Sequence, residues 1–134
     1  MQKNYRDNAY PALYYIELKT GQADRGPAWI TRPQFSRERK TLYFANKALI
    51  RNKGGIQGNY VDKESGEEYW VSGVKKNGKD RHWAGGGPIQ IDATVVADYL
   101  ALRHLDQLPK QFHIVTLAPT DTTRFHIHEN APIT

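Results

Sequence analysis

Turn-forming residues recur so often in this chain that most of it is divided into segments too short for a helix. Gly, Pro, Asn and Asp separate short runs of aromatic and β-branched residues from about position 13 to 117. The separating residues favour turns, whereas Val, Ile, Tyr, Phe and Trp favour a pleated surface. The pattern therefore predicts a mainly β fold built from short strands.

We expect about six or seven short strands. These are drawn from the strand-like segments 13–18, 28–30, 41–44, 48–50, 60–61, 69–74, 89–91 and 112–117, with a tight turn at Asn46-Lys47. A second turn signal, Asn77-Gly78, is the dipeptide best suited to the positive φ angles of a type I′ hairpin. This register would place Lys76 opposite Lys79 and Lys75 opposite Asp80. The hairpin tip is therefore expected to be exposed and basic.

One segment has helical periodicity. Asp92 is a good N-cap, and the helix is expected to run from about 93 to 105. Its apolar side chains fall on one stripe that should pack on the sheet, namely Val95, Val96, Tyr99, Leu100 and Leu102.

The predicted fold class is mainly β, with an α+β character. It is a small curved antiparallel sheet or a partly open SH3-like or OB-like barrel, with one helix in the C-terminal half. The alternative is an α+β sandwich with the helix on one face. We expect one compact domain over residues 1–117, followed by a polar, extended or flexible tail over 118–134.

Composition narrows the classes of function. The chain has no cysteine, which excludes disulfides, thiol nucleophiles and Cys-ligated zinc. No apolar run approaches the roughly 20 residues of a membrane span, and no secretory signal is recognisable, so a cytoplasmic protein without a membrane partner is expected. The formal charge of +5 favours acidic partners such as nucleic acid. The oligomeric state is left open.

The most distinctive stretch is VSGVKKNGKDRHWAGGG, residues 71–87. Basic grooves interleaved with aromatic side chains bind single-stranded nucleic acid by phosphate contacts and base stacking. The alternative is that the aromatics are core residues and the lysines protect an edge strand. Residues 25–53 are a second basic stretch. If this stretch packs beside the hairpin, the two would form one positive face. The predicted nucleic-acid-binding residues are Lys75, Lys76, Lys79, Arg81, His82 and Trp83, with Arg37, Arg39 and Lys40 as a second positive group.

Other chemistries have weaker signals. The three glycines 85–87 are followed by proline and a strand rather than by the Gly-Lys-Ser/Thr of a phosphate loop. His126 and His128 alternate as metal ligands can, but no third ligand stands at a useful spacing. His82 has no nucleophile or carboxylate placed beside it by sequence. The sequence therefore predicts no enzyme activity, no cofactor and no metal.

Several segments resemble a family of small bacterial proteins with no assigned function. The resemblance covers about residues 10–117 and rests on Lys40-Thr41-Leu42-Tyr43-Phe44, 58–62 (GNYVD), 65–73 (SGEEYWVSG), 80–83 (DRHW) with the glycines after it, and Ile91-Asp92. It implies a shared compact domain rather than a reaction. Members are sometimes labelled as an isoprenoid-precursor synthase, but such thiamine diphosphate enzymes are several times longer and need a Gly-Asp-Gly motif that this chain lacks.

The sequence thus predicts a non-enzymatic binding module whose basic, aromatic-bearing surface contacts nucleic acid. The alternative is a protein-interaction partner, such as an antitoxin, immunity or regulatory subunit, that binds an acidic protein surface.

Overall fold

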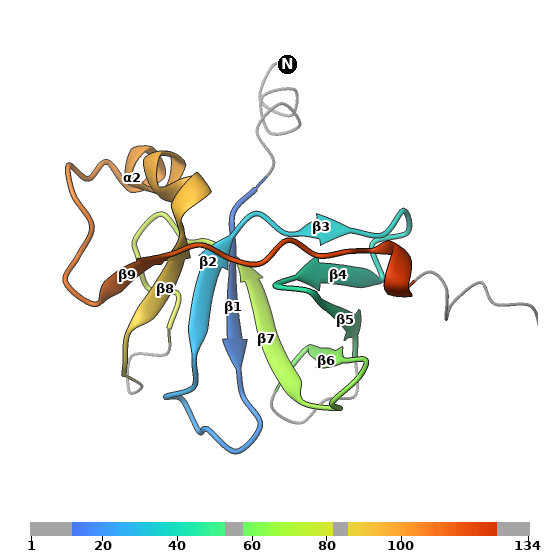
Figure 1. The fold of residues 1–134 in the computed structure, drawn as a ribbon. Coiled ribbons are helices and arrows are strands. Elements are labelled where there is room, and N and C mark those ends of the chain that lie inside the picture. Colours follow the sequence, from blue (N-terminus) through green and yellow to red (C-terminus); the bar gives the residue numbers. More distant parts are fainter. Residues whose placement is uncertain (1–11, 53–57, 82–85, 126–134) are drawn as a thin grey trace, which may run out of the picture.

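The computed structural model describes residues 12–52, 58–81 and 86–125, which form one curled nine-stranded sheet with a short helix (Figure 1). The strand order is β3-β4-β5-β6-β7-β1-β2-β8-β9. The strands are β1 (Tyr14–Leu18), β2 (Ala28–Thr31), β3 (Gln34–Phe35), β4 (Thr41–Phe44), β5 (Lys47–Arg51), β6 (Tyr60–Asp62), β7 (Glu68–Gly73), β8 (Ile89–Asp92) and β9 (Phe112–Val115). The predicted mainly β class, a curved and partly open barrel with one late helix, is confirmed.

The curl is visible in the packing of the inner face. The ring of Trp29 in β2 lies edge-on to Phe44 in β4, with ring centroids 5.2 Å apart, although five positions in the strand order separate β2 from β4. Ile16, Leu49 and Val71 belong to the same buried cluster. Only a strongly bent sheet brings side chains of such distant strands together, so this cluster fills the concave face.

The opposite face is covered by the helix. Tyr15, Ile30 and Ile91 are buried there together with Val95 and Tyr99. The alternation of side chains along β1 sends Tyr15 to this outer face and Ile16 to the concave one. Each strand of the centre of the sheet therefore contributes to two separate cores.

The helix forms where the sequence predicts it. A 3₁₀ turn, η1 (Ala93–Val95), leads into α2 (Val96–Arg103), and the Asp92 carboxylate accepts a hydrogen bond from the Thr94 amide at 2.9 Å. Partial burial opposes ionisation of Asp92, but hydrogen bonds from Thr94 and from the Thr31 hydroxyl outweigh it, so the pKa of Asp92 lies below its usual value. The helix ends at His104, which adopts a left-handed conformation.

The strands on either side of the helix are parallel. β8 pairs in parallel with β2 and with β9, and α2 is the crossover between β8 and β9. The remaining pairings among the described residues are antiparallel, as predicted. A parallel pair requires a crossover connection, which explains why α2 lies at this point of the chain.

The predicted β-hairpin at Asn77-Gly78 is wrong. β7 ends at Gly73, and residues 74–80 form a loop that pairs with no strand. The Asp80 carboxylate accepts a hydrogen bond from the Lys75 amide at 2.8 Å, in place of a ladder of backbone bonds. Gly78 has a φ of +77°, and a Cβ there would collide with the guanidinium of Arg103. The loop therefore folds onto the helix rather than extending the sheet.

The expected Asn46-Lys47 turn lies one residue earlier. Ala45 and Asn46 have φ angles of +50° and +61°, and Phe44 pairs with Lys47 across the two-residue loop. This is the geometry of a type I′ hairpin.

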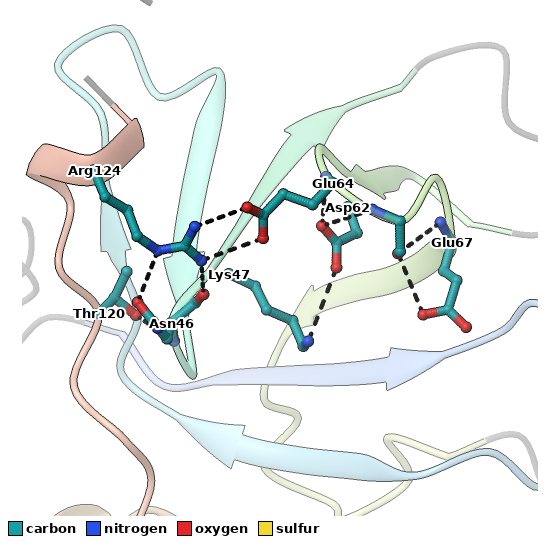
Figure 2. A network of polar contacts seen from close by, with 8 residues as sticks. Asn46, Lys47, Asp62, Glu64, Glu67, Thr120 and Arg124 are labelled. Carbon is teal, nitrogen blue, oxygen red and sulfur yellow. Dashed lines mark hydrogen bonds and ion pairs between the residues drawn. The ribbon is translucent and has the colours of Figure 1, made fainter. Parts of the chain in front are cut away.

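The expectation of a free tail after residue 117 is also wrong for the part that the structure describes. The chain crosses the open side of the sheet to reach the β4–β5 hairpin, and Phe125 is only 1% exposed against Tyr43 and Ala48. Figure 2 shows how Arg124 holds this end: its guanidinium donates to both Glu64 carboxylate oxygens and to the Asn46 carbonyl. The compact domain therefore includes residues 118–125.

Candidate nucleic-acid interface

The predicted cationic residues do not form one continuous face. Lys75, Lys79 and Arg81 line a cleft of about 810 Å³ on the outer face of the sheet, beside Trp70. Arg39 lines a different cleft of about 440 Å³, which opens on the concave side. The turn over 36–40 lies beyond β3, whereas the 74–81 loop lies beside α2 and β8 (Figure 1). The hypothesis that the two groups meet is therefore wrong.

Strand alternation explains this separation. In the β1–β7 register Glu17 pairs with Trp70, so both side chains point to the outer face. Tyr14 pairs with Gly73 and points to the concave face, where Arg39 approaches its hydroxyl at 3.4 Å. We call the Trp70 side the outer cleft and the Arg39 side the end cleft.

The floor of the outer cleft is a buried network of charges. The Glu17 carboxylate accepts a 2.6 Å hydrogen bond from the Tyr15 hydroxyl and pairs with the Lys19 ammonium at 3.1 Å. Lys19 also pairs with Asp24 at 2.7 Å. Burial opposes the charge on Lys19, but its hydrogen bonds to Asp24 and Glu17 outweigh this and raise its pKa. Burial and the adjacent Glu17 carboxylate together raise the pKa of Tyr15.

Arg81 belongs to this floor, so its assignment as a phosphate contact is wrong. Its side chain is only 8% exposed. The guanidinium donates to the carbonyls of Asp24, Gly26 and Pro88 at 3.0, 3.0 and 3.3 Å, and it lies 3.5 Å from the Glu17 carboxylate. These contacts tie together the β1–β2 connection and the start of β8. Arg81 is a structural residue.

Lys75 and Lys79 are the accessible cations of the outer cleft. Both residues are exposed, and neither ammonium group has an ion pair within the part of the chain that the structure describes. The carboxylate between them, Asp80, is buried. Burial raises the pKa of Asp80 above its usual value, although the Lys75 amide and the nearby cations Lys75 and Arg103 oppose this shift. Lys76 is exposed on the same loop but does not line the cleft.

Trp70 supplies an accessible aromatic surface. It is 41% exposed, whereas its neighbour Tyr69 is 2% exposed, because adjacent strand residues point to opposite faces. Trp70 therefore lies on the less buried face of β7. His82 and Trp83 lie outside the described residues, so their predicted contacts stay predictions. Trp29 packs against Phe44 on the concave face and is half-buried.

The second positive group is divided. Arg37 and Lys40 are exposed in the β3–β4 turn, and the Lys40 ammonium lies 3.6 Å from Glu38. Arg39 instead turns toward the end cleft, which also contains Arg51. Arg51 carried no distinctive local motif in the sequence. The signal that could have identified it is its position two residues after Leu49, which places both side chains on the same face of β5.

Metal-ligand clusters and long apolar helices are both absent from the described residues. Within 12–52, 58–81 and 86–125 no group of three His, Cys, Asp or Glu side chains is arranged to hold a metal ion. His126 and His128 lie outside these ranges. No helix in the described part is long and apolar enough to span a bilayer.

No protein-family model, no curated protein and no solved structure matches this chain. The resemblance to small bacterial proteins therefore stays a prediction, and the functional argument depends on the geometry of the two clefts.

Proposed function

We propose that the protein is a binding module that contacts single-stranded nucleic acid through the outer cleft. The observation that carries this proposal is the accessible Trp70 indole beside two lysines, Lys75 and Lys79, that have no ion pair with any residue the structure describes. Single-strand binding proteins combine cations that follow the backbone with aromatic faces on which bases stack. The outer cleft offers both in one place.

The buried network beneath the cleft supports the same assignment. Glu17 and Asp24 are both paired with Lys19, and Glu17 is also close to Arg81. The negative charges of these carboxylates are therefore balanced by Lys19 and Arg81. The ammonium groups that remain accessible are those of Lys75 and Lys79. Asp80 also lines the cleft but is buried, so a phosphate that enters meets the two exposed lysines at the rim.

The lysine contribution is tested by a salt series. Binding of a fluorescent oligothymidine of about 12 nucleotides is measured by anisotropy between about 50 and 300 mM salt, with a duplex of equal length for comparison. Because each phosphate contact on a single strand contributes about 0.7 to the slope of log K against log salt, Lys75→Gln with Lys79→Gln should reduce that slope by about 1.4. The charge-matched control is Arg37→Gln with Lys40→Gln, which should leave it unchanged.

The stacking contribution is tested separately. Trp70→Ala should weaken single-strand binding by about 5- to 150-fold, because a stacked base contributes about 1 to 3 kcal/mol. The exposed position of Trp70 means that the variant should retain its unfolding midpoint. If the wild-type protein shows no salt-sensitive binding to either oligonucleotide, the proposal is wrong.

One observation favours the alternative of a protein partner. β9 is an edge strand, and Ile114 at its centre is 59% exposed. Such an edge can accept a further strand from another protein. In that case Ile114→Lys would abolish capture of the partner and Trp70→Ala would not, which separates the two functions.

A further inference from the structure

The end cleft is built by the alternation of side chains at the open end of the half-barrel. Leu49 lies deep in the concave core, and Arg51, two residues later on β5, points to the same side near the rim. Arg51 pairs with Tyr60 across the β5–β6 ladder, and both line the cleft. Tyr14 contributes from β1. The end cleft is thus the part of the concave face, at the open end of the half-barrel, that core side chains do not fill.

Arg39 is held over this opening by a strained turn. Its amide donates to the Ser36 carbonyl at 2.9 Å, and its φ is +61°, a conformation that non-glycine residues rarely adopt. The guanidinium lies 4.0 Å from the centroid of the Phe35 ring. Tyr14 in turn meets Phe35 edge-on at 5.4 Å. The exposed Arg39 guanidinium is therefore oriented by the Phe35 ring and the Tyr14 hydroxyl.

The charge of this cleft is unbalanced. Among the described residues its lining has two arginines, two asparagines and three aromatic residues but no carboxylate: Tyr14, Phe35, Arg39, Arg51, Asn52, Asn59, Tyr60, Val71, Ser72 and Gly73. Neither Arg39 nor Arg51 has an ion pair within the described residues. This contrasts with the outer cleft, where buried carboxylates compensate the deeper cations.

We propose that the end cleft binds a small molecule in which an oxyanion, phosphate or carboxylate, is attached to a planar ring. Arginine forks match both oxyanions geometrically, and Arg39 and Arg51 would hold the oxyanion between them. The ring would lie against Tyr14, Phe35 and Tyr60. A volume of about 440 Å³ falls within the range of small-molecule sites. The inference is independent of the outer cleft, because none of the residues that line one cleft lines the other.

The test is a calorimetric titration of the full chain with four compounds. Adenosine 5′-monophosphate carries a ring and a phosphate, benzoate a ring and a carboxylate, adenosine only the ring, and inorganic phosphate only the oxyanion. We expect saturable binding of at least one of the first two, at least about 10-fold tighter than that of adenosine and of inorganic phosphate. The compound that binds identifies which oxyanion the site takes.

The site is assigned by variants. Arg51→Gln and Arg39→Gly should each weaken that binding by about 10- to 100-fold, since each removes a charge-assisted fork. Arg39→Gly also relieves the positive φ, so its unfolding midpoint should not fall. The matched control Arg37→Gln removes an exposed charge two residues away and should not change binding. Trp70→Ala should not change it either, which separates this site from the outer cleft.

Three results would each overturn the inference. One is the absence of saturable binding of both ring-bearing anions at millimolar concentration. Another is equal binding by wild type and Arg51→Gln. The third is that neither ring-bearing anion binds more tightly than adenosine and inorganic phosphate.

Discussion

Replacing Arg81 by lysine should lower the free energy of unfolding. It should not remove a ligand contact, because Arg81 is buried in the floor of the outer cleft. The wild-type guanidinium donates to three backbone carbonyls and lies beside Glu17, in a side chain that is 8% exposed. A lysine ammonium keeps the charge but cannot present the planar fork that reaches carbonyls of Asp24, Gly26 and Pro88 together. At about 1.5 kcal/mol for each of two lost charged hydrogen bonds, the free energy of unfolding should fall by roughly 3 kcal/mol.

The assay is urea unfolding followed by far-ultraviolet circular dichroism. With a denaturant slope of about 1 to 3 kcal/mol/M, a loss of about 3 kcal/mol lowers the midpoint by about 1 to 3 M. Arg81→Met should be at least as destabilising, because it also leaves Glu17 with one cation fewer. Combining it with Glu17→Gln should recover part of the loss, since the neutral side chain no longer needs a second cation and its oxygen can still accept from the buried Tyr15 hydroxyl.

The neighbouring Lys79→Gln is the control, because it removes an exposed charge from the same cleft and should leave the midpoint unchanged. If Arg81→Lys unfolds at the wild-type midpoint but loses oligonucleotide binding, Arg81 contacts phosphate and the structural role assigned to it is wrong.

Three further substitutions probe other parts of the argument. Phe125→Ala should lower the free energy of unfolding by about 3 kcal/mol, because a fully buried ring is removed, and a wild-type midpoint would show that residues 118–125 do not contribute to the core. Asp92→Ala should lower the free energy of unfolding by about 1 kcal/mol at pH 7. Because the pKa of Asp92 is lowered in the folded protein, the difference in stability between wild type and variant should be complete above the ordinary aspartate pKa and should disappear as the pH falls through the folded pKa. Unfolding measured at pH 7 and pH 2 checks this. Gly26→Ala should destabilise strongly, since its Cβ would overlap the Leu18 carbonyl, and soluble expression with a wild-type melting temperature would contradict this.

The class of fold was predictable because the local signals are strong and agree with one another. The short punctuated strands formed close to their expected positions, and the Asp92 cap started the helix where the stripe of Val95 and Tyr99 begins. These features depend on a few neighbouring residues, which a sequence displays directly.

The Asn77-Gly78 hairpin was not predictable in its actual form because the deciding contacts are distant in sequence. A local turn does form, since the Asn77 side chain accepts from the Lys79 amide at 2.9 Å, but Gly78 has a positive φ and Asn77 does not, so it is not the predicted type I′ turn. The loop nevertheless packs on Arg103, 25 residues further along the chain from Gly78, and this contact replaces strand pairing. Likewise, the polar composition after residue 117 predicted a tail. The segment nevertheless contains Phe125, and burial of this ring holds the chain against the sheet.

The candidate site was predictable in its residue types but not in its arrangement. Counting basic residues treats Arg39, Lys75 and Arg81 as equivalent, whereas the fold assigns them to the end cleft, the rim of the outer cleft and its buried floor. Alternation along β1 and β7 decides which face each neighbouring side chain meets, but a one-residue change of register reverses every such assignment. Composition therefore indicates that a cationic site exists without locating it.

The division of the positive charge between two clefts limits how strongly the protein can bind a long strand. Proteins that track a phosphate backbone neutralise many phosphates and lose affinity steeply with salt. Of the residues that the structure describes, Lys75 and Lys79 are the accessible cations that line the outer cleft, so the slope of log K against log salt on a single strand should be about −1.4. A measured slope of about −4 or steeper would require four or more further cations on the same path, including Lys76 and the β3–β4 turn. Such a value would contradict the separation of the two clefts, whereas a shallow slope with a large effect of Trp70→Ala would identify stacking as the main source of affinity.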